Sequence, residues 1–145
     1  MTPDVNVLVA AYRSDHPHHL PARAWLDEAI VQAANGRSSL MLLGVVVTGF
    51  IRITTNPRIF RETDPLQDLT DFVDRLLGCP GVQFQAQGAT WANLRQVCLT
   101  QQVGGNLLTD VWIAATVLQS GETLCTFDRD FKKLLPADKL HLLSR

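Results

Sequence analysis

Pro-Asp-Val-Asn-Val-Leu-Val, residues 3–9, places one carboxylate, Asp4, in a segment that otherwise has the composition of a protein core. Two later segments have the same character, with Asp110 in Asn-Leu-Leu-Thr-Asp-Val-Trp-Ile-Ala-Ala (106–115) and Asp128 in Cys-Thr-Phe-Asp-Arg-Asp-Phe (125–131). A lone carboxylate in apolar surroundings costs on the order of several kcal/mol or changes its protonation. We therefore expect the three acids to share a partner, such as a metal ion, a basic side chain or backbone N–H groups.

Short apolar runs alternate with amphipathic segments around these acids. We expect strands at a very short run before Asp4 and at 39–43, 82–85, 123–127 and 139–143, and helices at 17–34, 45–55, 66–77, 91–98 and 106–120. Segment 45–55 is rich in β-branched residues, but Val46, Phe50 and Ile53 keep helical spacing. Segment 106–120 is apolar nearly all round, which predicts a buried helix. The alternation predicts an α/β sandwich around a parallel sheet.

The length and the cysteines limit the class of protein. The 145 residues fit a single domain over 1–145 with a sizeable core. Cys79, Cys98 and Cys125 are an odd number without a Cys-x-x-Cys pair, which argues against a disulfide framework or a thiolate zinc site. We therefore expect a reducing, cytoplasmic location.

Charge and hydropathy bear on two further properties, nucleic-acid binding and membrane insertion. The formal net charge of −1 gives no global attraction to nucleic acid, so such binding requires a local basic patch. The longest apolar stretch, 40–51, is well short of the roughly 20 residues that span a bilayer. We expect no membrane association.

The positions of the acids in the predicted fold bring them together. Asp4 and Asp128 follow strands, and Asp110 lies near the start of a helix. In open parallel sheets, functional sites lie beyond the carboxyl ends of the strands, where these segments converge. Clustered carboxylates need protons or cations, and hard oxygen ligands favour Mg²⁺ or Mn²⁺. Such ions activate water and neutralise charge during phosphodiester hydrolysis.

Five segments, taken together and in order, resemble the PIN-domain ribonucleases, and in particular the VapC-type toxins of bacterial toxin–antitoxin pairs. They are 4–9, the pattern of Asp15, His16, His19 and Trp25, Gly-Phe-Ile-Arg-Ile-Thr-Thr-Asn-Pro-Arg-Ile-Phe at 49–60, 106–115, and Thr-Phe-Asp-Arg-Asp-Phe at 126–131. The resemblance implies a three-layer α/β/α PIN-like fold whose short, mainly parallel central sheet has about four to five strands. It also implies metal-dependent cleavage of structured RNA, with transfer RNA or ribosomal RNA as substrates.

The resemblance also implies site residues and partners. Asp4, Asp110 and Asp128 take the family's acidic positions as catalytic residues and ligands of Mg²⁺ or Mn²⁺, and Asp130 supports the metal site from nearby. The implied partners are a VapB-type antitoxin, whose tail enters the active-site groove, and a second copy of the chain. One departure concerns the glutamate that many PIN domains carry before a Phe-Ile-Arg-like segment, because Gly49 stands there in this chain. The number of metal ions therefore stays open.

Several polar residues have a functional and a structural interpretation. Asn6, Thr109 and Thr126 are expected to hold the neighbouring carboxylates, although each also suits local capping or turns. Asp4 and Asp110 also suit a helix start, and Asp128 a turn, although the three acids together favour the functional interpretation. The best basic cluster for RNA phosphates consists of Arg52, Arg58 and Arg61; for Arg58 and Arg61, plain surface solvation fits equally well. The histidines of 16–19 most simply occupy a loop and a helix start.

Two rival functions and one question about the chain start stay open. A PIN scaffold without the glutamate would bind RNA or its antitoxin without efficient cleavage. A phosphomonoester hydrolase would use Asp4 as its nucleophile, but such enzymes usually need a second acid two residues later, where this chain has Asn6. Only Met1, Thr2 and Pro3 precede Asp4, so we expect either a frayed first strand or a start upstream of Met1.

Overall fold

The computed structural model describes residues 1–144 and contains five short strands, all paired in parallel. They are β1 (Thr2–Pro3), β2 (Leu40–Leu43), β3 (Val82–Gln85), β4 (Leu124–Thr126) and β5 (Leu140–Leu142). Regular pairing gives a ladder β1-β4-β5 and a ladder β2-β3. The amide of Met41 donates to the carbonyl of Met1 at 2.8 Å, which joins β2 to the chain just before β1. The strands therefore lie in the order β3-β2-β1-β4-β5.

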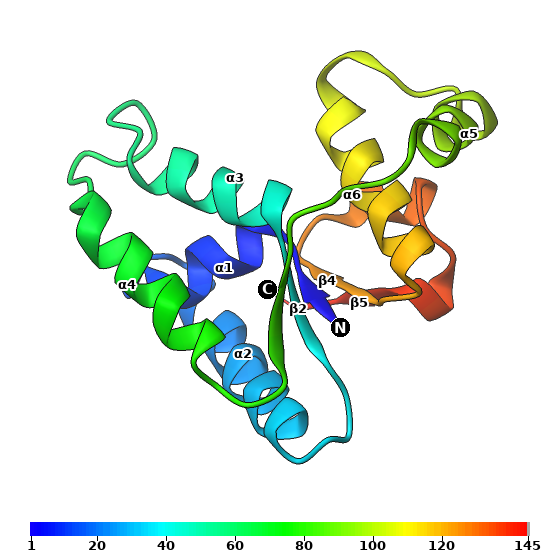
Figure 1. Ribbon diagram of the computed structural model, residues 1–145. Helices are drawn as coiled ribbons and strands as arrows, with labels where there is room; N and C mark the ends of the chain where they lie inside the picture. The colour runs from blue at the N-terminus through cyan, green and yellow to red at the C-terminus, as the bar shows by residue number, and fades with distance from the viewer. Residues whose placement is uncertain (145) are drawn as a thin grey trace.

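Within residues 1–144, six α-helices cover the two faces of these strands (Figure 1). They are α1 (Val5–Tyr12), α2 (His19–Ala34), α3 (Gly44–Thr54), α4 (Leu66–Leu77), α5 (Trp91–Gln101) and α6 (Leu108–Ser120). Single turns of 3₁₀-helix occur at η1 (Gly105–Leu107), η2 (Arg129–Lys133) and η3 (Ala137–Lys139). Helices α1 to α4 gather on one side of the strands and α5 and α6 on the other. The expected three-layer α/β/α fold with a parallel central sheet is confirmed.

Helix α1 is deeply buried because it lies between the strands and two other helices. Val7 and Leu8 are fully buried, and α1 packs against both α2 and α3. The helix begins at Asp4, whose backbone is extended and whose side chain caps the first turn. This cap fixes the direction in which the chain leaves β1. The predicted very short first strand is confirmed, since β1 has two residues.

Helix α3 forms despite its β-branched composition because its apolar face packs into the core. Phe50 is fully buried and meets the edges of Tyr12 and Phe72, with ring centroids 5.5 and 5.6 Å away. A Cβ atom at Gly49 would lie only 2.8 Å from Cγ2 of Val5. The glycine therefore allows α3 to approach the start of α1 closely, and the helix predicted over 45–55 is confirmed.

Helix α6 differs from its prediction in where it begins and how far it is buried. The 3₁₀ turn η1 precedes it, so the α-helix begins at Leu108. Ala114 and Val117 are fully buried, but Trp112 and Leu118 are 45% and 39% exposed. The predicted buried helix is therefore present on the side that faces the core and α5, whereas Trp112 and Leu118 reach the surface.

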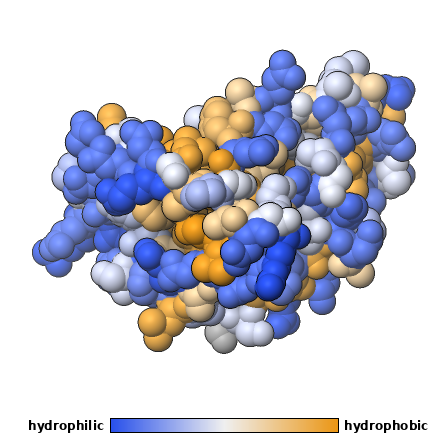
Figure 2. Space-filling model, turned by 60° about the horizontal axis from the view of Figure 1, so that its bottom comes forward, coloured by the Kyte–Doolittle hydropathy of each residue, from blue (hydrophilic) through white to orange (hydrophobic). Residues whose placement is uncertain are grey.

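Apolar side chains also reach the surface elsewhere. Figure 2 shows them near the middle of one face, between large hydrophilic areas. None of the helices within residues 1–144 combines the length and the apolar character that crossing a bilayer requires.

Candidate functional site

The three acids singled out in the sequence line one cavity of about 430 Å³ at the carboxyl ends of the strands. Asp4 follows β1, Asp128 follows β4, and Asp110 lies in the first turn of α6. The parallel pairing of β1 with β4 brings the first two together across more than 120 residues of sequence. The other wall residues are Val5, Asn6, Val9, His16, Arg52, Ile53, Ile59, Phe60, Asn106, Thr109 and Ile113.

Asp4 is held by three hydrogen bonds. Its Oδ1 accepts from the Val5 amide at 2.7 Å, and its Oδ2 accepts from the Asn6 side-chain amide at 2.7 Å and the Thr126 hydroxyl at 2.6 Å. A carboxylate offers about four acceptor positions, so about one is left for a further ligand. Asp4 is therefore fixed in orientation and still able to bind a cation.

The protonation of Asp4 is unusual. Burial raises its pKa from 3.8 to about 6, and the charges of Asp110 and Asp128 add to this rise. The hydrogen bonds from Thr126 and Val5 act in the opposite direction. Burial also raises the pKa of Asp110, and the charges of Asp128 and Asp130 raise it further. Within residues 1–144 no basic side chain forms an ion pair with Asp4, Asp110 or Asp128, so their negative charge favours the binding of a cation.

Thr126 and Asn6 connect the acids to one another. The Thr126 oxygen accepts the Asp128 amide at 2.9 Å while its hydroxyl donates to Asp4. Asn6 donates to Asp4, and its Oδ1 accepts the Phe127 amide at 3.2 Å. Asp128 in turn caps η2 by accepting the Asp130 amide at 2.8 Å. The expected contacts of Asn6 and Thr126 with the acids are present, and Thr109 lies on the same wall beside Asp110.

The donor set suits a hard cation that keeps part of its water shell. The acids offer only carboxylate oxygens, the ligands that Mg²⁺ and Mn²⁺ prefer. Across residues 1–144, no group of three His, Cys, Asp or Glu side chains is arranged to hold an ion by itself. Mg²⁺ is commonly bound through one or two carboxylates and several waters. The arrangement therefore fits an ion bound by two of the acids and water.

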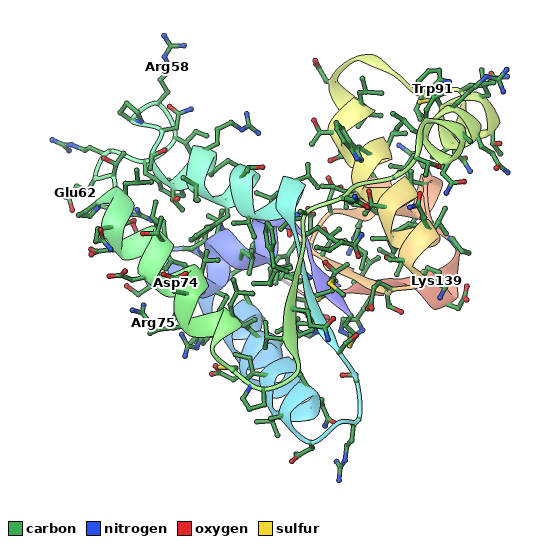
Figure 3. All side chains as sticks on the ribbon, in the orientation of Figure 1. Arg58, Glu62, Asp74, Arg75, Trp91 and Lys139 are labelled. Carbon is green, nitrogen blue, oxygen red and sulfur yellow. The ribbon has the colours of Figure 1, made fainter. Side chains whose placement is uncertain are left out.

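The structure separates the other predicted site residues into two groups. Arg52 lies on the cavity wall, whereas Arg58 and Arg61 are exposed and outside it. In Figure 3, Arg58 points away from the helices at the tip of the α3–α4 loop. Asp130 also lies off the wall and forms an ion pair with Lys133 at 2.7 Å. Of these four residues, only Arg52 lines the cavity.

His16 lies in the loop before α2, as predicted, but its position on the cavity wall beside the acids was not predicted. Its Nδ1 accepts the His18 amide at 3.1 Å, so a neutral ring carries its proton on Nε2. Burial and the neighbouring His18 lower the pKa of His16, which favours this neutral form. The ring position depends on the turn formed by residues 13–19, and no local sequence signal indicates it.

Ile59 and Phe60 of the α3–α4 loop also line the cavity, and Arg13 secures this loop. The half-buried Arg13 bonds to Asp15 and Asp64 at 2.8 and 2.7 Å and to the Glu62 carbonyl at 3.0 Å. Its guanidinium also lies 4.1 Å from the ring centre of Phe60. Arg13 therefore determines the position of one wall of the site.

Comparison with known proteins identifies the family. Residues 1–134 match the PIN domain family. The chain belongs to the PIN domain family. Its relatives include "VapC ribonuclease Mb2897" of Mycobacterium bovis, 36% identical over 131 residues that cover 90% of this chain and 86% of that protein. "Ribonuclease VapC25" of Mycobacterium tuberculosis is 33% identical over 90% of this chain and 89% of its own length. This PIN domain is therefore of the VapC type.

Solved structures share the fold of this PIN domain. VapBC2 from Rickettsia felis, crystallised with a DNA fragment from its promoter, matches 99% of this chain and 98% of its own with a TM-score of 0.62 and 15% identity. FitAcB from Neisseria gonorrhoeae matches 97% of this chain and 95% of its own, with a TM-score of 0.60 and 19% identity. At these identities the likeness shows the fold alone.

Proposed function

We propose that this VapC-type PIN domain is a metal-dependent endoribonuclease, acting as the toxin of a type II toxin–antitoxin pair. The observation that carries the proposal is the convergence of Asp4, Asp110 and Asp128 on one cavity. The proposal is supported by the 36% identity to a VapC ribonuclease over 90% of the chain. The proposed substrate is structured RNA, with transfer RNA or ribosomal RNA as the first candidates.

The residues of the chain have separate tasks in this proposal. Asp4, Asp110 and Asp128 would hold Mg²⁺ or Mn²⁺, two of them directly and the third through bound water. The ion would supply an activated water and neutralise charge on the phosphodiester. Asn6 and Thr126 keep Asp4 oriented and favour its ionised form through their hydrogen bonds. Arg52 on the cavity wall binds a phosphate oxygen of the RNA. Ile59 and Phe60 narrow the access of bulk water.

The test is cleavage of total cellular RNA by purified protein without antitoxin, in Mg²⁺ or Mn²⁺ and in EDTA. We expect discrete cuts that require the metal and disappear in the Asp110→Asn variant. Circular dichroism establishes that the variant is folded. Undiminished turnover by folded Asp110→Asn protein would refute the assignment of the acids.

The structure also favours a second candidate, a PIN scaffold that binds RNA or its antitoxin without efficient cleavage. Val5 packs against Gly49, so no side chain fits at the expected glutamate position without moving α3 from α1. The site therefore has three acids and no fourth in α3. Binding of RNA without metal-dependent cuts, across a broad set of RNAs, would favour this candidate.

The phosphomonoester hydrolase receives less support. Asp4 is 5% exposed and its Oδ2 accepts two hydrogen bonds, so this oxygen is poorly placed to attack a phosphate. The second acid that such enzymes use is replaced by Asn6, which is itself bonded to Asp4. Failure to trap a phosphoaspartate after incubation with a reactive phosphomonoester is the expected result.

The proposed partners are a VapB-type antitoxin and a second copy of the chain. An antitoxin tail that enters the acid cavity would block access to the RNA, and co-purification should then abolish cleavage. An apolar cavity of about 480 Å³ with half-exposed Phe84 and Trp112 on its wall supports pairing of two copies. Sedimentation of the parent chain and of Phe84→Glu tests the homodimer, which the substitution should dissociate.

A further inference from the structure

Two further cavities continue from the acid cavity along the surface. The first, of about 360 Å³, shares Asn6, His16 and Asp128 with the acid cavity and adds His18 and Phe127. The second, of about 490 Å³, shares Phe127 and is otherwise lined by Arg129, Lys132, Leu142, Leu143 and Ser144. We name the second one the basic cavity. The shared walls make one path from the three acids to Arg129 and Lys132.

The basic cavity holds cationic charge that its neighbours do not neutralise. Arg129 and Lys132 are exposed, and neither forms an ion pair within the part of the chain that the structure describes. The adjacent Lys133 differs, because Asp130 pairs with it. An anionic ligand therefore finds two free cations at one end of the path and three carboxylates at the other.

Between the two ends lies an aromatic surface. The His18 ring stacks on Phe127 with centroids 4.9 Å apart and planes inclined by 26°. Phe127 is buried, so the His18 ring packs on a fixed side chain. The ring centroids of His16 and His18 lie 5.6 Å apart, and the two ring planes are tilted. Rings supported in this way are suitable platforms for nucleic-acid bases, whose faces stack on aromatic side chains with little regard to sequence.

We propose that the basic cavity is a second phosphate-binding site for RNA, occupied by the strand that runs from the acid cavity across His18. The proposal rests on the proposed function for the identity of the ligand. A strand at the acid cavity meets carboxylates that repel its phosphates, so cations nearby must supply the attraction. The net charge of −1 cannot supply it globally. Arg129 and Lys132 are placed to do so, with one cavity between them and the acid cavity.

The experiment measures binding of a fluorescent, mixed-sequence single-stranded RNA by fluorescence anisotropy over a range of salt concentrations. The background is Asp110→Asn, so that the RNA is not consumed. The double variant Arg129→Ala/Lys132→Ala is compared with Arg23→Ala/Arg75→Ala, which removes the same charge from exposed positions on α2 and α4. Arg23 and Arg75 line none of the three cavities.

The expected result is a specific loss of electrostatic binding. The Arg129→Ala/Lys132→Ala protein should bind the RNA on the order of tenfold more weakly, with a log–log salt slope lower by about 1.4, since each phosphate contact to a single strand contributes about 0.7. In the cleavage-competent background KM should rise while kcat is retained. The control pair should leave the slope and KM unchanged.

Two results would overturn the proposal. One is a salt slope of the double variant equal to that of the control pair. The other is a loss of antitoxin binding with unchanged RNA binding, which would assign the basic cavity to the protein partner. Absence of metal-dependent cleavage by the parent chain, together with a reduced salt slope in the double variant, would refute the proposed nuclease and uphold this RNA site.

Discussion

The Thr126 hydroxyl donates to Asp4 Oδ2 over 2.6 Å, from a residue 122 positions later in the chain. The same oxygen accepts the Asp128 amide, so one hydroxyl at the end of β4 orients two of the three acids. Thr126 is fully buried and therefore has no water to replace either contact. The site depends on this side chain although it carries no charge.

Thr126→Val replaces the hydroxyl by a methyl group of similar size. We expect the free energy of unfolding to fall by about 1.5–3 kcal/mol, because a buried carboxylate loses a charge-assisted hydrogen bond. RNA cleavage should fall as well, since Asp4 is no longer held. Urea denaturation and cleavage assays measure the two effects. Thr126→Ser retains the hydroxyl and should preserve both activity and most of the stability; equal losses in Val and Ser variants would contradict the role of the hydroxyl.

The raised pKa of Asp4 predicts how stability depends on pH in EDTA. Below its ordinary pKa of 3.8, Asp4 is protonated in both the folded and the unfolded chain, so its burial as a charge does not reduce the free energy of unfolding. As the pH rises toward about 6, the unfolded chain loses this proton first, so the folded state binds more protons and its stability falls. The rise of the Asp4 pKa from 3.8 to about 6 corresponds to a loss of about 3 kcal/mol in the free energy of unfolding. This loss is complete once the pH exceeds the pKa of the folded state.

Asp4→Asn cannot titrate and is the matched comparison. We expect the stability of the parent chain relative to Asp4→Asn to decline between about pH 4 and pH 7, as measured by urea unfolding at each pH. Mg²⁺ at the higher pH should recover part of the loss for the parent chain alone, because a cation stabilises the ionised carboxylate. A difference independent of pH would show that Asp4 ionises normally.

Gly49→Ala tests the contact between α3 and α1. Alanine favours a helix by up to about 1 kcal/mol over glycine, but its Cβ would lie 2.8 Å from Val5 Cγ2. We expect a net destabilisation of about 1–3 kcal/mol from overpacking. The double variant Gly49→Ala/Val5→Ala should be more stable than the sum of the single effects indicates, which a thermodynamic cycle measures. Strict additivity would show that the two helices adjust without cost.

Arg13→Ala tests the attachment of the α3–α4 loop. Arg13 contacts Asp15, Asp64 and the ring of Phe60, so its removal should loosen the wall that Phe60 forms. We expect faster proteolysis in residues 55–65 and a higher KM for RNA. The control is Arg23→Ala, which removes an exposed arginine paired with Asp27 on the same helix, a contact worth only about 0.5 kcal/mol. It should change neither the proteolysis of residues 55–65 nor the KM for RNA. Equal cleavage of the loop in both variants would argue against this role.

The sequence was most informative where a segment has a single way to bury its apolar residues. Helix α4 and strand β3 have the predicted boundaries, 66–77 and 82–85, because glycine and proline interrupt the pattern between them. The meeting of Asp4 and Asp128 was also predictable, since parallel strands end at the same edge of the sheet. The topology of a parallel sheet is therefore enough to predict that Asp4 and Asp128 lie at the same edge, without knowledge of the side chains around them.

The remaining features depend on contacts that a linear pattern does not contain. Trp112 is 45% exposed although its helix is apolar nearly all round, because which side of a helix meets the core is a tertiary property. Asp130 lies outside the cavity because the 3₁₀ turn directs it to Lys133 rather than to Asp128. His16 reaches the wall through a turn whose geometry depends on a hydrogen bond to His18. The exposure of Trp112 and the positions of Asp130 and His16 therefore follow only from the three-dimensional structure.

The two-residue strand β1 has a consequence for the time at which the protein becomes active in the cell. Asp4 obtains its backbone partner, the Cys125 carbonyl, and its hydroxyl partner, Thr126, from strand β4, which is synthesised about 120 residues later. A nascent or prematurely terminated chain without β4 therefore has its first acid but no site. The candidate site can therefore assemble only after residues 124–128 have been synthesised.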